Sequence, residues 1–69
     1  GVNLRNKLQI SLAAARVNAG MTQEEVAKEL RVSKSTVLNW EKGKVSPKYA
    51  QFKMLCDIYD ISEDYIFLP

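Results

Sequence analysis

Four pairs of residues recur along the chain and constrain its fold more than any other feature. Each is an apolar residue followed by serine or threonine: Met21-Thr22, Val32-Ser33, Val45-Ser46 and Ile61-Ser62. A hydroxyl at a helix N-cap can accept a backbone N–H that has no partner within the helix. The apolar residue before it can pack against another at the fourth helical position. Four such signals predict a chain of short helices without strands.

Apolar residues at helical spacing complete the prediction and give five helices. The first is expected at Leu4–Ala19. Its apolar residues at that spacing would form a buried stripe: Leu4, Leu8, Leu12 and Ala15. The other four helices are expected at Gln23–Leu30, Lys34–Lys42, Pro47–Tyr59 and Glu63–Phe67. Ser46 would then be the N-cap of the fourth helix, and Cys56 would lie on its apolar stripe as a small core residue.

Only Arg31, Val32 and Ser33 separate the second and third helices. So short a connection prevents antiparallel packing along their full lengths, so the two should cross steeply, as in a helix-turn-helix. On the third helix, Val37 and Trp40 share an apolar face that should be buried. The opposite face carries cations, a hydroxyl, an amide and one aliphatic group: Lys34, Ser35, Leu38, Asn39 and Lys42. Such a face suits base edges and phosphates, although an ordinary solvated face is the alternative interpretation.

Charge is distributed unevenly, although the net charge is only +2. Residues 31–53 hold six cations and one acid, Glu41, for a net of +5, whereas residues 54–69 hold four acids and no cation. A basic middle and an acidic end favour a molecule with one face for a polyanion such as DNA. Chance scatter in a short chain is the alternative.

Composition excludes several classes of protein. Sixty-nine residues without a linker-like stretch predict one domain, residues 1–69. No apolar run approaches the roughly 18 residues of a membrane span and no signal peptide is evident, so we expect a cytoplasmic protein, in a bacterium or phage-encoded in its host. With no histidine, one cysteine and no glycine-rich phosphate loop, we expect no catalysis, no metal site and no cofactor.

The stretch from Thr22 to Pro47 resembles the phage-repressor type of helix-turn-helix domain, the Cro-like and lambda-repressor-like (Xre) family. The segments that carry the resemblance are Gly20-Met21-Thr22-Gln23, Val26-Ala27, Val32-Ser33 and Trp40-Glu41-x-Gly43, followed by Leu55, Tyr59, Ile61-Ser62 and Asp64-Tyr65-Ile66. The resemblance extends from Leu8 to Phe67. It implies a compact all-α five-helix domain that regulates transcription, most often as a repressor, with its third helix in the major groove of double-stranded DNA.

The resemblance also implies roles for individual residues. The side chains expected to contact bases are Lys34, Ser35, Leu38 and Asn39. Those expected to contact phosphates are Gln23, Thr36, Lys42, Lys44 and Lys48. Arg16 and Glu41 would form a partly buried ion pair between the first and third helices. Arg31 and Asp60 stand where the family often has glycine, so we expect both in the left-handed backbone region, where a non-glycine residue costs about 1–2 kcal/mol.

One recognition helix reads only a few base pairs, so the resemblance implies a palindromic operator bound by a weak homodimer or by two copies that pair on DNA. The fifth helix and Phe67-Leu68-Pro69 are the candidate dimer contact. The alternative is a protein-interaction module on the same fold, in which Leu38 and the apolar end of the chain contact a partner without DNA readout.

Overall fold

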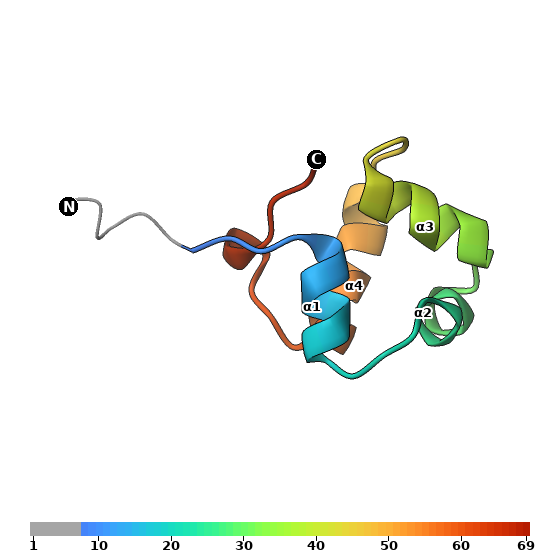
Figure 1. The fold of residues 1–69 in the computed structure, drawn as a ribbon, viewed down its shortest axis with the longest axis horizontal. Helices are drawn as coiled ribbons and strands as arrows, with labels where there is room; N and C mark the ends of the chain where they lie inside the picture. The colour runs from blue at the N-terminus through green and yellow to red at the C-terminus, as the bar shows by residue number, and fades with distance from the viewer. Residues whose placement is uncertain (1–7) are drawn as a thin grey trace.

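The computed structural model describes residues 8–69, which form four α-helices and one 3-10 turn (Figure 1). The elements are α1 (Leu12–Asn18), α2 (Gln23–Leu30), α3 (Lys34–Lys42), α4 (Tyr49–Tyr59) and η1 (Glu63–Tyr65). Within these residues the structure has no strand beyond one isolated bridge. The all-α architecture predicted from the sequence is therefore confirmed, with four α-helices in place of five.

Helices α2 and α3 begin and end where the sequence predicts. Thr22 Oγ1 accepts the backbone N–H of Glu25 at 3.1 Å, and Glu25 Oε1 accepts that of Thr22 at 2.8 Å, which completes a capping box. Ser33 Oγ accepts the backbone N–H of Thr36 at 3.1 Å. Arg31, at φ 58°, ends α2 in the left-handed region as expected. In Figure 1, α2 is seen nearly end-on while α3 runs across the view, so the two helices cross steeply.

The predicted first helix, Leu4–Ala19, is wrong at its beginning. Helix α1 starts only after Ser11, whose Oγ accepts the backbone N–H of Ala14 at 3.0 Å as an N-cap. Leu8 precedes that cap and is 86% exposed, so it does not extend the buried stripe. The predicted position of Leu4 lies outside the described residues.

The segment before α1 is extended because it pairs with the C-terminal segment. The Ile10 N–H donates to the Tyr65 carbonyl at 2.8 Å, and the Phe67 N–H donates to the Ile10 carbonyl at 3.1 Å. These bonds form the isolated parallel bridge between Ile10 and Ile66. In Figure 1 the blue segment before α1 and the red C-terminal segment cross at this place.

The predicted start of α4 at Pro47 is also wrong, as is the assignment of Ser46 as its N-cap. The N-cap is Lys48, and its backbone N–H donates to Gln51 Oε1 at 2.9 Å. Val45, expected to pack onto the first turn of α4, is exposed instead. The side-chain amide of Gln51, the third residue of α4, thus caps the helix. Pro47 lies in the connection before the helix and is buried.

The predicted helix Glu63–Phe67 is only a 3-10 turn. Ser62 caps it as expected, because its Oγ accepts the backbone N–H of Asp64 at 3.3 Å. The chain then leaves the turn in an extended conformation at Ile66, whose side chain is buried. Asp60, before this turn, has φ 53° and confirms the left-handed conformation expected there.

The core lies where the four helices meet. It is formed by Leu12, Ala15, Val26, Ala27, Leu30, Val37, Trp40, Phe52, Leu55, Cys56, Tyr59 and Ile66. Trp40, at 2% exposure, and Val37 are buried, which confirms the inner face predicted for α3. Packing between α2 and α3 is the most extensive of the interhelical contacts. Over residues 8–69, no helix has the length and apolar character that crossing a bilayer requires.

Candidate nucleic-acid interface

The outer face of α3 presents the four residues predicted to contact bases. Lys34 and Ser35, in the first turn, are exposed, whereas Leu38 and Asn39 are half-buried but still accessible. They face outward because the opposite face of the same helix packs into the core through buried Trp40. This is the chemistry that base edges require: an ammonium, a hydroxyl, an aliphatic group and an amide.

A cluster of hydroxyls surrounds the start of α3. Ser33 Oγ lies 2.8 Å from Thr36 Oγ1 and 3.1 Å from Ser35 Oγ, distances at which either member of each pair can donate. Ser35 and Thr36, predicted to contact a base and a phosphate, therefore already have partners within the helix cap. A ligand at this end of α3 would compete with these internal hydrogen bonds.

The predicted ion pair between Arg16 and Glu41 is present and is bidentate. Arg16 Nε donates to Glu41 Oε2 at 2.7 Å and Nη2 donates to Oε1 at 3.3 Å. The two side chains are 16% and 7% exposed. The hydrogen bond to Glu41 raises the pKa of Arg16, so the guanidinium stays charged. Arg16 Nη1 also donates to the Met21 carbonyl at 3.0 Å, and the network therefore joins α1, the following loop and the end of α3.

Gln23, predicted to contact phosphate, belongs to the same network. Its Nε2 donates to Glu41 Oε1 at 2.9 Å, which turns the amide nitrogen toward the carboxylate. The sequence interpretation missed this contact. A nearly buried carboxylate can accept more hydrogen bonds than one arginine supplies, and that need is the signal that could have indicated a further donor.

The lysines predicted to contact phosphates lie at the last residue of α3 and in the chain after it. Lys42 is the last residue of the helix, Lys44 lies in the loop after it, and Lys48 is the N-cap of α4; all three are exposed. Gly43 ends α3 at φ 78°, and a Cβ there would lie 2.9 Å from Pro69 Cβ. The C-terminal residue thus packs against the turn that presents Lys42 and Lys44.

A comparison with protein-family models matches residues 12–66 to a helix-turn-helix family of the Xre and lambda-repressor type. The chain belongs to this family. This is a family of DNA-binding regulatory domains, which are not typically enzymatic. The match begins at α1 and ends at Ile66, so it includes α3 and the network that holds it. Comparisons with curated proteins and with solved structures found no match.

One further charged residue of this helix-turn-helix lies beside the predicted interface, although the sequence interpretation did not include it. Glu24 Oε2, in the first turn of α2, lies 2.9 Å from Lys34 Nζ. Both side chains are exposed, 65% for Glu24 and 55% for Lys34. The hydrogen bond from Lys34 lowers the pKa of Glu24. The pair joins the first turn of α2 to the first turn of α3. It therefore lies at the N-terminal end of α3, whereas the Arg16–Glu41 network lies at the C-terminal end.

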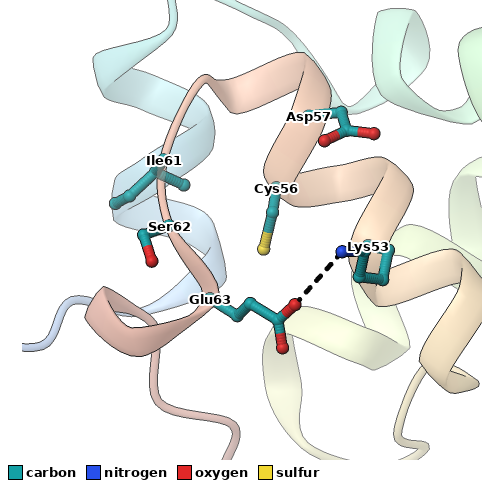
Figure 2. A pocket seen from close by; sticks show the side chains of 6 residues that line it. All are labelled: Lys53, Cys56, Asp57, Ile61, Ser62 and Glu63. Atoms are coloured by element: carbon teal, nitrogen blue, oxygen red, sulfur yellow. Dashed lines mark ion pairs between the residues drawn. The ribbon is translucent and has the colours of Figure 1, made fainter.

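A small pocket of about 240 Å³ lies between α4 and the segment after it (Figure 2). Its lining residues are Lys53, Cys56, Asp57, Ile61, Ser62 and Glu63, none of which is a predicted DNA contact. Lys53 Nζ and Glu63 Oε2 form an ion pair at 3.4 Å across it. Burial raises the pKa of the Cys56 thiol, which disfavours a reactive thiolate. Among the described residues, no cluster of three or more potential ligands could hold a metal ion.

Proposed function

We propose that this domain is a transcriptional repressor of the phage or prophage type, which binds a specific double-stranded operator and reads the major groove with α3. The observation that carries the proposal is the outer face of α3, where the side chains proposed to read bases are accessible and exposed lysines come next in the chain. The function places the protein where duplex DNA is, in the bacterial cytoplasm or nucleoid.

The base contacts in this proposal follow from side-chain chemistry. Asn39 can donate to and accept from adenine at once, which contributes about 1–3 kcal/mol of discrimination. Leu38, beside it, suits the methyl group of thymine. Lys34 and Ser35, one turn earlier, would meet neighbouring base pairs, with the ammonium of Lys34 suited to the acceptors of guanine.

The phosphate contacts would position the helix without reading sequence. Lys42, Lys44 and Lys48 are exposed along one stretch of chain, so each can neutralise a phosphate and release counterions. Gln23 and Thr36, near the starts of α2 and α3, would add uncharged hydrogen bonds. The first turn of α2 also has backbone N–H groups that favour an anion.

A pair of half-sites belongs to the same proposal, because one helix reads too few base pairs for a useful operator. Two copies on a palindrome would place their recognition helices about 34–36 Å apart. The surface proposed for their contact consists of Tyr65, Phe67 and Leu68, which are apolar or aromatic and substantially exposed.

Two substitutions test whether α3 lies in the major groove, because they should weaken DNA binding in different ways. Asn39→Ala should weaken binding to a duplex selected from a random library and leave binding to a scrambled duplex and the salt dependence nearly unchanged. Lys44→Ala should weaken binding to both duplexes about equally and reduce the slope of log K against log salt by about one. Lys28→Ala, which removes an exposed charge from α2, is the matched control and should change neither.

The result that overturns the proposal is equally specific. The proposal that α3 lies in the major groove is wrong if the wild-type protein binds no duplex. It is also wrong if the Asn39→Ala and Lys44→Ala variants both bind as the wild type does. The protein-interaction function of the same fold would then take its place.

A further inference from the structure

The exposed pair Glu24–Lys34 is unexpected at the proposed interface. A carboxylate beside a polyanion is repelled by it, yet Glu24 lies 2.9 Å from a lysine proposed to contact a base. The pair bridges the second residue of α2 and the first residue of α3, on opposite sides of the turn that joins them. Its position therefore links it to the proposed function rather than to the core.

Lys34 differs from the other proposed DNA-facing lysines because it has an acidic partner. Within residues 8–69, the ion pairs of lysine side chains join Lys34 to Glu24 and Lys53 to Glu63. Lys42, Lys44 and Lys48 form no ion pair there, so no acid holds their ammonium groups away from a phosphate. Among the lysines proposed to face DNA, only the one proposed for base contact is held by an acid of the described residues.

The carboxylate restricts what the ammonium can reach. A lysine is a point charge on a flexible stem, and without a partner it binds phosphates of any sequence. Its ammonium has three donors, of which Glu24 takes one, so two remain for other acceptors. Guanine presents two adjacent acceptors, O6 and N7, in the major groove.

We propose that Glu24 determines specificity by holding Lys34 away from phosphates, so that the ammonium adds affinity only where a base pair presents acceptors. This inference rests on the proposed function. An exposed ion pair contributes at most about fivefold to an equilibrium, whereas a good base contact discriminates by roughly 5- to 150-fold. The pair is thus weak enough to adjust at the operator and strong enough to reduce binding elsewhere.

The test compares Glu24→Gln with Glu29→Gln, which removes the same charge from an exposed position of the same helix. Binding is measured at several salt concentrations to a duplex selected from a random library and to its scrambled counterpart. Glu24→Gln should bind the scrambled duplex about fivefold more tightly and the selected duplex less than about twofold more tightly. The salt slope on scrambled DNA should steepen by about 0.9, the contribution of one new phosphate contact. Glu29→Gln should affect both duplexes equally.

Lys34→Ala shows whether Glu24 acts through its partner. In the Lys34→Ala background, Glu24→Gln should no longer steepen the slope on scrambled DNA. The inference is overturned if the steeper slope persists there, or if Glu24→Gln and Glu29→Gln behave alike. Those results leave the proposed function standing. Wild-type protein that binds no duplex, or binds both duplexes equally, would instead overturn the proposed function and this inference with it.

Discussion

Replacing Arg16 by methionine should remove most of the stability of the domain. Methionine keeps the apolar stem but removes the two donors to Glu41 and the one to the Met21 carbonyl. Glu41, nearly buried, would keep Gln23 as its side-chain donor. Breaking a buried pair costs about 3–5 kcal/mol. Because Arg16 retains some exposure and Gln23 stays, we expect about 3 kcal/mol, a large part of the roughly 5 kcal/mol at the low end for small domains.

Urea unfolding followed by circular dichroism and by Trp40 fluorescence would measure this loss. A double-mutant cycle with Glu41→Gln separates the pair from the individual side chains. The double variant has no unpaired buried charge, so it should be about 2 kcal/mol more stable than the sum of the single losses predicts. Lys28→Met, a loss of one exposed charge, is the control and should stay within about 0.5 kcal/mol of wild type.

Two results would refute the argument. A loss below about 1 kcal/mol for Arg16→Met would mean that Glu41 is not effectively desolvated in the native state. Additive losses in the cycle would mean that the two side chains are not energetically coupled, whatever their distance. In either case the end of α3 would be held by apolar packing alone.

Three further predictions concern stability. Trp40→Ala should cost about 3–5 kcal/mol in urea unfolding followed by circular dichroism, because Trp40 is almost completely buried and the cavity cannot close. Arg31→Gly should raise the thermal midpoint, because glycine removes the strain of about 1–2 kcal/mol at φ 58° and its greater chain entropy offsets only part of that gain. Burial raises the pKa of Tyr59 to about 12, so the unfolded chain releases that proton first. Stability should be unaffected by this group below pH 10 and fall between about pH 10 and 12, and Tyr59→Phe should reduce that fall.

Local signals were sufficient for the helix-turn-helix. The capping box at Thr22 and the N-cap at Ser33 lie within three residues of the groups they satisfy, so the sequence predicted both helix starts correctly. The left-handed conformation of Arg31 was expected from the family resemblance and is confirmed. The buried inner face of α3 follows from helical spacing alone.

One error occurred where a distant segment decides the local structure, and another where a neighbouring side chain supplies a different cap. Leu8 has the spacing of a helical stripe, but the neighbouring Ile10 pairs with Tyr65 and Phe67, more than fifty residues away, and that pairing requires an extended backbone. At α4, Ser46 had the local signature of a cap. The structure uses Gln51 instead, and a serine pattern cannot reveal that choice.

The candidate site was predicted residue by residue, but only one of its internal contacts was predicted. The pair of Arg16 and Glu41 came from the resemblance, and its geometry is confirmed. The contacts of Gln23 with Glu41 and of Glu24 with Lys34 were not predicted, because each depends on the crossing of α2 over α3. Spacing within one helix contains no information about that crossing.

The two ends of α3 are held in different ways, and this difference should appear in base preference. At the C-terminal end of α3, Glu41 accepts buried hydrogen bonds from Arg16 and Gln23. These bonds hold the last turn of the helix, which contains Asn39. At its start, Lys34 is held away from phosphates by one exposed ion pair, which leaves two donors of its ammonium for base acceptors. A bidentate amide needs a donor and an acceptor in fixed positions, whereas an ammonium, as a point charge, can donate to any base pair that presents acceptors. Systematic base substitution in the selected duplex should therefore show stricter preference opposite Asn39 than opposite Lys34, and equal strictness at both would contradict this difference.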